Sequence, residues 1–322
     1  MKIVVFGGGT GLSILLRGLK KYTRDISAIV TVADNGGGSG VLREDLGMLP
    51  PGDMRNCIIA LSDIEPIMVS LMQHRFNDGY LKGQSFGNLL IAAMYEIFGD
   101  YEHALKEIGS IFRLSGKVLP MTLQDAQLKA HLDNGECILG EKDIPDYVSK
   151  SNCKIDRVSL VPEVCTPLEE TLKDIKEADI VLLGPGSLYT SVIPNILVSN
   201  ITEAIVESKA KVFYICNLMT QPGETDNYNV YDHVNAIIKH SSRYLIDYVI
   251  ANDELISESQ IQNYKFKGAK QVILDDEQIK KLEGINIKVI SSDFTEIKKN
   301  YIRHNSEKIG QLLFNYVTEK NK

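Results

Sequence analysis

The sequence lacks any apolar run approaching the roughly 20 residues that a membrane-spanning helix needs. It passes from Met1 directly into a β-branched segment, without the basic start, apolar middle and small-residue cleavage site of a secretory signal. Its five cysteines are scattered and form no CxxC pair, so nothing indicates a zinc site or a disulfide framework. These absences predict a cytoplasmic protein with reduced thiols.

An excess of positive charge is also absent. The chain has 35 Lys and Arg against 42 Asp and Glu, a net charge of −7 and a pI near 5.5. Nucleic acid is therefore not expected as a partner, because binding its phosphate backbone requires a concentrated excess of positive charge. A small anionic ligand remains compatible, because backbone amides can bind it without net positive charge.

Several catalytic motifs are missing. No HExxH or GxSxG sequence occurs, so zinc hydrolysis and the hydrolase nucleophile elbow lack support. The Walker A pattern fails because Gly7–Gly11 is followed by Leu12 and Ser13 without a lysine. No protein metal site is predicted.

The pattern of apolar segments indicates an α/β protein. β-branched runs alternate with helical patterns over 322 residues, which favours a mainly parallel sheet. We expect one domain over 1–322, with a helical insertion at about 54–115 and a β-hairpin at about 126–140. The expected strands are Ile3–Gly7, Ile26–Val32, Arg157–Val161, Asp179–Leu183, Ala210–Asn217, Tyr248–Ala251, Gln271–Leu274 and Ile287–Ile290.

The first strand ends in three consecutive glycines within KIVVFGGGTG, and a helix is expected over Leu12–Lys20. Glycines let backbone N–H groups approach an anion, and the N-terminus of the next helix adds unsatisfied donors and partial positive charge. The dinucleotide fingerprint GxGxxG is incomplete because Leu12 stands where its third glycine belongs. We predict phosphate binding here; the alternative is a tight turn that only needs a glycine or two.

A second glycine loop, Asn35–Arg43, follows the second expected strand. Ser39 and Arg43 offer a hydroxyl and a guanidinium, which both suit a phosphate. Asp34 stands where nucleotide-binding folds place a carboxylate on ribose, or else it forms a turn before Asn35-Gly36. Because the carboxyl ends of parallel strands meet at one edge, both glycine loops should face one crevice.

Two later strands end in further polar loops. GPGS at Gly184–Ser187 repeats the design of the first turn, with Thr190 beyond it, and NLMTQPGET begins at Asn217. Tyr189 is either a packed aromatic or a surface for stacking a base, with packing slightly favoured.

Other candidates lie outside the glycine loops. Asp53 is interpreted as the N-cap of a helix over Met54–Leu61, with a metal or substrate ligand as the alternative. Asn88 either caps a helix or touches a ligand. Tyr264 and Arg303 are proposed outer contacts, one as an aromatic platform and one as a fixed cation. Lys299–Lys308 is basic and contains Ser306 near a helix start.

Taken together, the motifs resemble the gluconeogenesis factor family (YvcK-type, UPF0052), within the wider group similar to 2-phospho-L-lactate transferase (CofD-like). The resemblance rests on GGGTG at Gly7, DNGGGSG at Asp34, PPGDMRN at Pro50, GQSFGNLL at Gly83, LGPGSLYTS at Leu183 and NLMTQPGET at Asn217. It implies a Rossmann-like three-layer αβα fold with a nucleotide over the glycine loops.

The resemblance also implies a regulatory factor that binds UDP-sugars and is needed for growth and cell shape on gluconeogenic carbon sources, through cell-wall synthesis proteins. NAD or GDP are alternative ligands, and a homo-oligomer is compatible with this reading. The alternative function is a phosphate-linked group transferase that uses a nucleotide-diphosphate donor, with Asp34 or Asp53 and Mg²⁺ as catalytic candidates. Ser306 is the candidate for regulatory phosphorylation. The nucleotide-binding candidates are Gly8, Gly9, Thr10, Gly11, Asp34, Asn35, Gly37, Gly38, Ser39, Arg43, Asn88, Gly184, Pro185, Gly186, Ser187, Tyr189, Thr190, Asn217, Met219 and Arg303.

Overall fold

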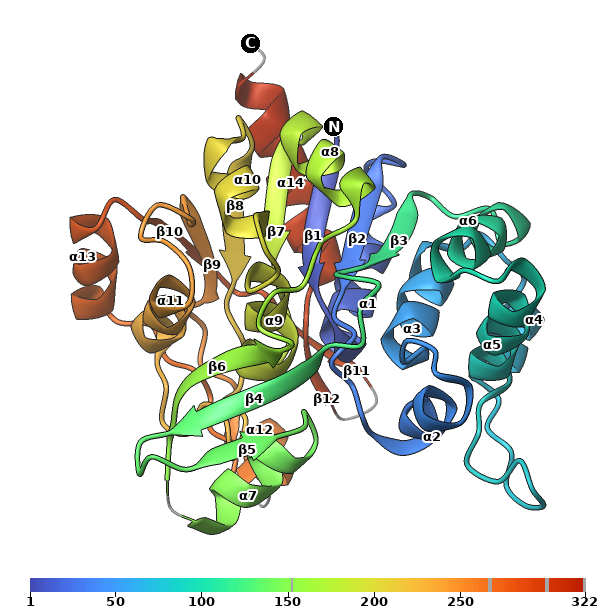
Figure 1. Ribbon diagram of the computed structural model, residues 1–322. Helices are drawn as coiled ribbons and strands as arrows, with labels where there is room; N and C mark the ends of the chain where they lie inside the picture. Colours follow the sequence, from blue (N-terminus) through green and yellow to red (C-terminus); the bar gives the residue numbers. More distant parts are fainter. Residues whose placement is uncertain (152, 266–267, 299–300, 321–322) are drawn as a thin grey trace.

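The computed structural model describes residues 1–151, 153–265, 268–298 and 301–320, and it is built around a parallel sheet (Figure 1). Every neighbouring pair of strands in this sheet is parallel. The inner strands are buried on both faces, which explains why they read as continuous apolar runs. In spatial order the strands are β10 (Lys288–Ser292), β9 (Tyr248–Asn252), β8 (Lys211–Ile215), β7 (Ile180–Leu183), β1 (Ile3–Gly7), β2 (Ile26–Val30) and β3 (Lys117–Pro120).

The direction in which the chain adds strands reverses between β1 and β7. From β1 the sheet grows through β2 to β3, and from β7 it grows the opposite way through β8 and β9 to β10. The loops that leave β1 and β7 therefore diverge to opposite sides, and open α/β sheets bind ligands in the crevice that such a reversal creates. Both loops carry the predicted glycine turns.

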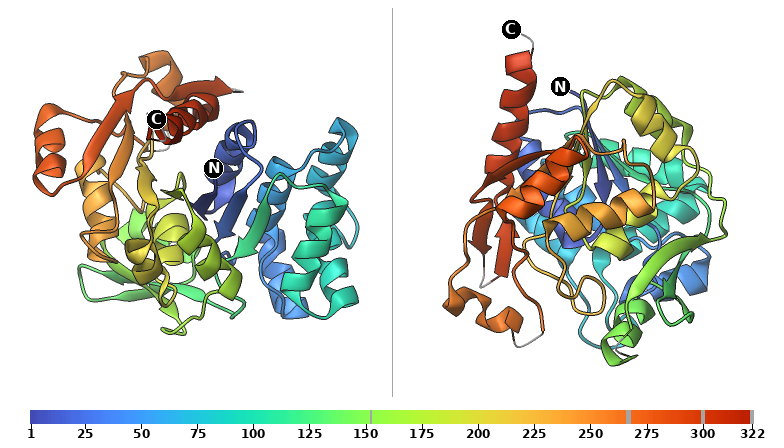
Figure 2. Two further views of the ribbon diagram at one scale, coloured as in Figure 1. Left: turned by 90° about the horizontal axis from the view of Figure 1, so that it is seen from above. Right: turned by 90° about the vertical axis from the view of Figure 1, so that its left-hand side faces the viewer.

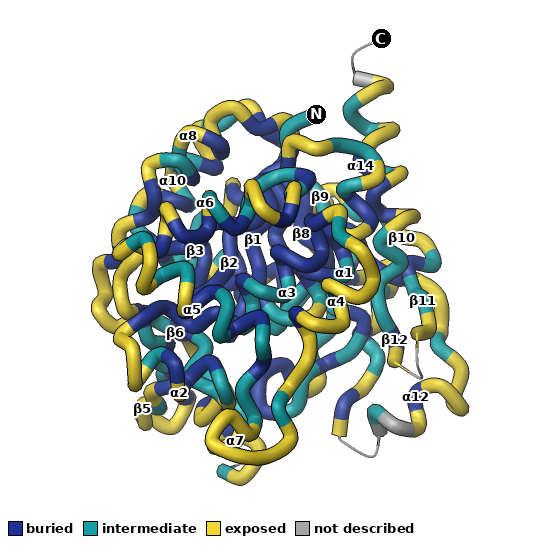
Figure 3. Tube along the Cα trace, turned by 90° about the vertical axis from the view of Figure 1, so that its right-hand side faces the viewer, coloured by how far each residue is buried: buried dark blue, intermediate teal, exposed yellow. Residues whose placement is uncertain are grey.

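Helices cover both faces of the sheet (Figure 2). One face carries α1 (Gly9–Leu19), α3 (Gly52–Leu61) and α14 (Ser306–Lys320), and the other carries α8 (Glu169–Glu177) and α10 (Ile201–Glu207). Figure 3 shows the strands buried between these layers, with exposed segments on the surrounding helices and loops. The prediction of a three-layer α/β fold is confirmed.

The segment between β2 and β3 is helical. It contains α2 (Gly37–Leu46), α3, α4 (Pro66–Gln73), α5 (Phe86–Phe98) and α6 (Tyr101–Ile111). Side-chain caps begin two of these helices: Ser85 accepts a hydrogen bond from Asn88 N, and Asp100 accepts one from His103 N. This group lies beside β3, at one edge of the sheet (Figure 1).

Smaller elements gather at the carboxyl edge of the sheet (Figure 1). A three-stranded antiparallel sheet lies across it, formed by β5 (Cys137–Leu139), β4 (Gln127–Leu132) and β6 (Ile155–Val161), with α7 (Asp143–Ser151) between β5 and β6 in the chain. Near it are α12 (Glu258–Lys265) and the hairpin of β11 (Thr295–Lys298) and β12 (Tyr301–His304). The remaining elements are the π-helical turn η1 (Leu188–Val192), α9 (Ile193–Ile196), α11 (Val230–Lys239) and α13 (Asp276–Gly284).

Two local predictions were wrong. The second glycine loop is not a loop throughout, because α2 begins at Gly37. Glycine disfavours helix in isolation, but a tertiary contact favours it at Gly38, where a Cβ would lie 3.2 Å from Gly83 O and 2.9 Å from Gln84 Oε1. Gln271–Leu274 is not a strand, because its backbone bonds go to the segment after β8: Val272 N donates to Leu218 O at 3.0 Å.

Two other boundaries differ from expectation. Helix α1 begins at Gly9 rather than at Leu12, so Gly9 and Gly11 belong to the first turn of the helix. The β11–β12 hairpin was not predicted. Part of the basic segment Lys299–Lys308 lies outside the described residues. Within the described part of the chain, no helix is both long and apolar enough to cross a membrane.

Substituting Gly18 tests the contact between α1 and α14. A Cβ on Gly18 would lie 2.3 Å from the backbone carbonyl oxygen of Ser306, which cannot rotate away. We expect Gly18→Ala to lower the free energy of unfolding by about 1–3 kcal/mol through overpacking, measured by urea denaturation. The matched control is Gly284→Ala in α13, where a Cβ meets no atom within 4 Å, and it should be neutral or slightly stabilising. Equal effects of the two substitutions would contradict the packing.

Candidate nucleotide site at the strand-order reversal

The turn after β1 is open to an approaching ligand. Gly9 has φ +66° and no atom within 4 Å of where a Cβ would lie. Gly8 is crowded instead, because its Cβ would fall 2.7 Å from Thr31 Cγ2 and 2.8 Å from Asp53 Oδ2. The backbone of Gly9 is therefore free to face a ligand, whereas the backbone of Gly8 is held tightly by its neighbours. The turn also provides the N-terminal donors of α1.

Asp53 faces this turn rather than capping its own helix. Its Oδ2 accepts a hydrogen bond from Gly9 N at 2.5 Å, and α3 has no side-chain cap. The N-cap interpretation is therefore wrong, since a tertiary contact has replaced the local one. Burial, and then the nearby Asp34 carboxylate, raise the pKa of Asp53 to about 6, although the Gly9 N–H and Arg55 oppose the shift.

The second glycine segment is held by local and tertiary hydrogen bonds. Asp34 Oδ1 accepts from Gly36 N at 2.8 Å, so Asp34 does form the turn. Asn35 Oδ1 accepts from Lys142 N at 3.0 Å, which ties the segment to the end of β5. Arg43 forms an ion pair with Asp125 and donates to Ala126 O at 2.9 Å. Its guanidinium thus holds the chain before β4, and it is committed there rather than to the first turn.

The turn after β7 lies directly against the turn after β1. A Cβ on Gly11 would lie 2.9 Å from Pro185 O, and one on Gly186 would lie 3.4 Å from Gly8 O. The first distance explains the glycine at position 11, because the facing backbone leaves no room for a side chain there, and the second shows that the two turns are in contact. The structure therefore brings together Gly8 to Gly11 and Gly184 to Gly186, as predicted from the sequence.

Tyr189 packs inside the protein. It is 2% exposed, and its hydroxyl lies 2.8 Å from that of Tyr228. The stacking alternative for Tyr189 is therefore wrong, and the packing interpretation holds. Ser187 is also engaged, since its Oγ donates to Gln221 Oε1 at 2.6 Å. Asn88 accepts from Arg55 Nη1 at 2.8 Å, within the helical group.

Sequence reasoning missed a pair of carboxyl groups beside these turns. Thr190 Oγ1 donates to Glu224 Oε1 at 3.2 Å, and Glu141 lies near the same hydroxyl. Burial raises the pKa of Glu141 to about 7 and that of Glu224 to about 8, and each is raised further by neighbouring carboxylates. The second oxygen of Glu224 is buried without a hydrogen-bond partner in the described structure.

Only one of these two carboxyl groups could have been noticed in the sequence. Glu224 belongs to NLMTQPGET, a motif that was already noted. Glu141 lies in an ordinary polar segment after β5. It reaches Thr190 only because the small sheet folds across the carboxyl edge, so no local signal could have found it.

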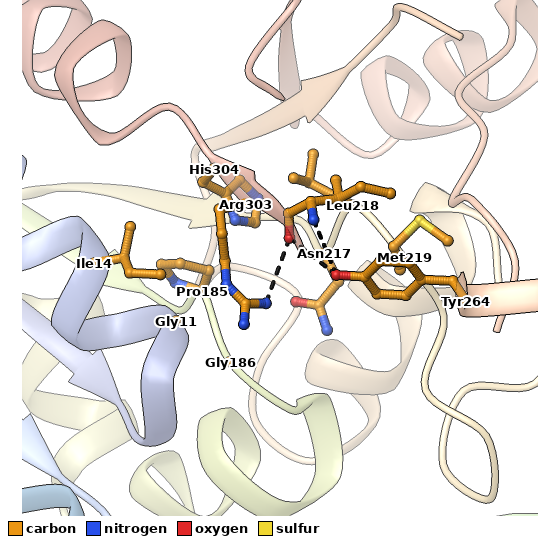
Figure 4. Close-up of a pocket in the computed structure, with 11 residues that line it drawn as sticks. Gly11, Ile14, Pro185, Gly186, Asn217, Leu218, Met219, Tyr264, Arg303 and His304 are labelled. Carbon is orange, nitrogen blue, oxygen red and sulfur yellow. Dashed lines mark hydrogen bonds between the residues drawn. The ribbon is translucent and has the colours of Figure 1, made fainter. Parts of the chain in front are cut away.

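A pocket opens beside the glycine turns (Figure 4). It encloses about 150 Å³ and is lined by Gly11, Ile14, Pro185, Gly186, Asn217, Leu218, Met219, Tyr264, Ile302, Arg303 and His304. Its wall therefore joins both turns to Asn217 and Met219 and to the outer residues Tyr264 and Arg303, all of which were candidates from the sequence.

Tyr264 is held rigidly at the pocket. Its hydroxyl accepts from Ile302 N at 3.0 Å and donates to Ile302 O at 3.3 Å (Figure 4). Those two bonds orient the ring while leaving its body in the pocket wall. A small apolar cluster of Leu218, Ile261 and Ile302 packs beneath it, with Tyr264 and Met219 against the cluster. The ring is thus a preformed aromatic surface.

His304 and Asn217 complete the wall. His304 Nε2 lies 2.9 Å from Cys216 O, which attaches β12 to the end of β8. Burial lowers the pKa of His304 to about 4, so the ring is neutral near pH 7 and donates this bond. Asn217 Oδ1 is buried without a hydrogen-bond partner in the described part of the chain. An acceptor left unpaired beside a cavity is available to a ligand N–H.

Comparison with known proteins decides the family. The family model for 2-phospho-L-lactate transferase CofD matches residues 3–295. The chain belongs to the CofD family. A relative from Thermoanaerobacterium thermosulfurigenes is 54% identical over 312 residues, which cover 97% of this chain and 95% of the relative.

Within the CofD family the chain is similar to the gluconeogenesis factors. The gluconeogenesis factor of Bacillus subtilis is 46% identical over 319 residues, covering 99% of this chain and 98% of that protein. A crystal structure of a UPF0052 family member from Bacillus halodurans matches with a TM-score of 0.92 at 44% identity, over 97% of this chain and 98% of that one. The resemblance drawn from the motifs is therefore confirmed.

The buried carboxyl of Glu224 predicts a pH-dependent stability for this CofD-family protein. Its folded-state pKa of about 8 lies above the ordinary value of 4.5, so between these values the folded state holds a proton that the unfolded state has lost. Stability contributed by this group is complete below the lower value and falls as pH rises, by at most about 1.4 kcal/mol per pH unit.

Between pH 5 and 8 the free energy of unfolding should fall less steeply in Glu224→Gln than in the wild type, because the amide does not titrate. Urea denaturation across this range measures it, and Glu283→Gln, at an exposed site, should keep the wild-type pH profile. An unchanged profile in Glu224→Gln would contradict the assignment.

Proposed function

We propose that the chain is a regulatory protein that binds a nucleoside-diphosphate sugar of the UDP-sugar class. The observation that carries the proposal is the juxtaposition of two glycine turns, at the reversal of strand order, with a pocket that contains a fixed aromatic ring and a cation. Phosphate suits backbone donors at a helix N-terminus, and a base suits an aromatic surface.

Each part of the ligand has a proposed place. The diphosphate lies over Gly9 and Gly11 at the start of α1. Asp53 accepts from the Gly9 N–H, which leaves the N–H groups of Thr10 and Gly11 in the first turn of the helix as its donors. The base enters the adjoining pocket against the ring of Tyr264.

Two polar groups would complete the contacts in the pocket. Arg303 stands beside the proposed base as a cation for phosphate or a stacking partner for the base. The unpaired Asn217 Oδ1 is available to an N–H group of the base, which uracil, guanine and adenine all provide in different positions.

The name of a relative supports a proposed role in the cell. A protein of Bacillus subtilis that covers nearly the whole chain is named a gluconeogenesis factor. We therefore propose that nucleotide-sugar binding regulates growth and cell shape on gluconeogenic carbon sources, through proteins of cell-wall synthesis.

Calorimetry tests the ligand directly. Purified protein titrated with UDP-N-acetylglucosamine, UDP-glucose, NAD and GDP should release heat with at least one UDP-sugar and bind it most tightly. Tyr264→Ala should weaken that binding at least about fivefold, because base stacking on an aromatic ring contributes roughly 1–3 kcal/mol.

The matched control is Tyr244→Ala, at a tyrosine that is 67% exposed and outside the pocket. It should bind the UDP-sugar as the wild type does. Absence of heat with all four nucleotides would overturn the proposal, and an unchanged affinity in Tyr264→Ala would remove the base from this pocket.

A transferase is the second candidate, favoured by the carboxyl groups beside the turns. Asp34 and Asp53 lie close enough for their charges to interact, and Mg²⁺ binds through one or two carboxylates together with substrate phosphates. Within the described residues no group of three His, Cys, Asp or Glu side chains could hold a metal alone. A metal would therefore need the phosphates of the donor as further ligands, and when bound it would neutralise their charge.

Turnover of a nucleoside-diphosphate-linked lactate donor tests this candidate. If the chain is a transferase, an acceptor hydroxyl, or water in its place, forms a bond to the lactate-bearing phosphorus as the bond to the nucleoside monophosphate breaks. Release of the monophosphate should require Mg²⁺ and should fall at least tenfold in Asp53→Asn, the range of a lost charge-assisted contact. Nucleotide release followed by chromatography measures it. Turnover that is the same in wild type and Asp53→Asn would exclude Asp53 from the mechanism.

A further inference from the structure

A second groove lies alongside the nucleotide pocket, between α1, the start of α14, the β11–β12 hairpin, and Asn56 of α3 with Gln73 of α4. It encloses about 520 Å³. Its wall contains the cations Arg17, Lys298 and Arg303 and the hydroxyls of Thr10, Ser13 and Ser306. Arg303 and Ile14 also line the nucleotide pocket, so the two cavities are neighbours that share one wall.

The charge of this groove is opposite to that of the whole chain. The chain carries a net charge of −7, yet the described residues that line the groove include three cations and no carboxylate. Lys298 has a partner, Glu296 Oε2 at 2.8 Å. Among the described ion pairs neither Arg17 nor Arg303 takes part, and Arg303 instead lies over the ring of Tyr301, 4.9 Å from its centroid. Two guanidinium groups without an ion pair among the described residues therefore line one cavity, although Glu296 stands opposite Arg303 across the hairpin.

The wall that carries these groups is rigid. Helices α1 and α14 approach so closely that a Cβ on Gly18 would meet the backbone of Ser306, and a Cβ on Gly310 would lie 2.7 Å from the ring of Tyr22. The start of α14 is fixed by Asn305, whose Oδ1 accepts a hydrogen bond from Lys308 N at 3.0 Å. Arg17 and the hydroxyls of Thr10, Ser13 and Ser306 thus project from closely packed helices, as a preorganised binding site requires.

We propose that this groove binds the phosphate group of a small phosphorylated metabolite, at a site separate from the nucleotide pocket. Guanidinium groups recognise phosphate oxygens through paired N–H donors, and the hydroxyls of Thr10 and Ser306 add neutral donors. The proposal does not require that the neighbouring pocket bind a nucleotide. Since Arg303 lines both cavities, its loss is expected to weaken both kinds of ligand.

The test uses inorganic phosphate and glycerol 3-phosphate as probes, titrated into the full-length protein and followed by calorimetry. Both probes should bind saturably. Arg17→Gln should weaken them about tenfold, because a hydrogen bond between charged groups contributes roughly 1.5–3 kcal/mol. The Arg17 side chain is exposed, so the variant should keep the thermal midpoint of the wild type. The matched control is Arg24→Gln, an exposed arginine just beyond α1 and outside the groove, which should bind both probes normally.

Two further variants separate this site from the proposed nucleotide site. Asn217→Ala removes a side chain that lines only the nucleotide pocket, so it should leave phosphate affinity unchanged. Arg303→Gln should weaken phosphate as well as any UDP-sugar. Wild-type phosphate affinity in Arg17→Gln would overturn the proposal, since the anion would then lie elsewhere, as on the glycine turn. The proposal is also overturned if neither probe binds saturably at concentrations up to roughly 10 mM. A dissociation constant of that size corresponds to a binding free energy of only about 3 kcal/mol.

Discussion

The close approach of two backbones organises this protein. At the reversal of strand order, the turn after β1 and the turn after β7 come within van der Waals distance, and a single Cβ on Gly11 would collide with Pro185 O. Because both turns leave the carboxyl ends of adjacent parallel strands, the N-terminus of α1 opens into the crevice between them. The pocket of Tyr264 and Arg303 is attached to this crevice by the bond between His304 and Cys216.

Carboxyl groups surround the same crevice, and their protonation links it to the small antiparallel sheet. Asp53 bonds to the backbone of the first turn, whereas Glu141 reaches Thr190 from beyond β5. Burial raises the pKa of all three carboxyls, Asp53, Glu141 and Glu224, toward or above neutrality. A proton held among these carboxyl groups lowers the negative charge that an incoming diphosphate would meet. An anionic ligand could therefore bind close to several acidic residues.

Local patterns predicted the parts of the structure that depend on local physics. Strands β1 and β7 read as buried because both faces are covered, and their glycine turns were visible as glycine clusters after apolar runs. What the sequence could not show were roles created by distant contacts. Asp53 looks like a helix cap until Gly9 is placed beside it, and Gly38 looks like a loop residue until Gly83 and Gln84 are placed against it in α2. Glu141 has no local signature at all. The family motifs identified the crevice, but not the partners of its carboxyls.

The most direct measurement of the central claim is a crystal structure of the protein grown with UDP-N-acetylglucosamine. The account predicts diphosphate density over Gly9 and Gly11 at the start of α1, with the uracil ring against Tyr264 and within reach of Asn217. Density for the nucleotide at any other place, with the pocket beside the glycine turns filled only by solvent, would contradict it.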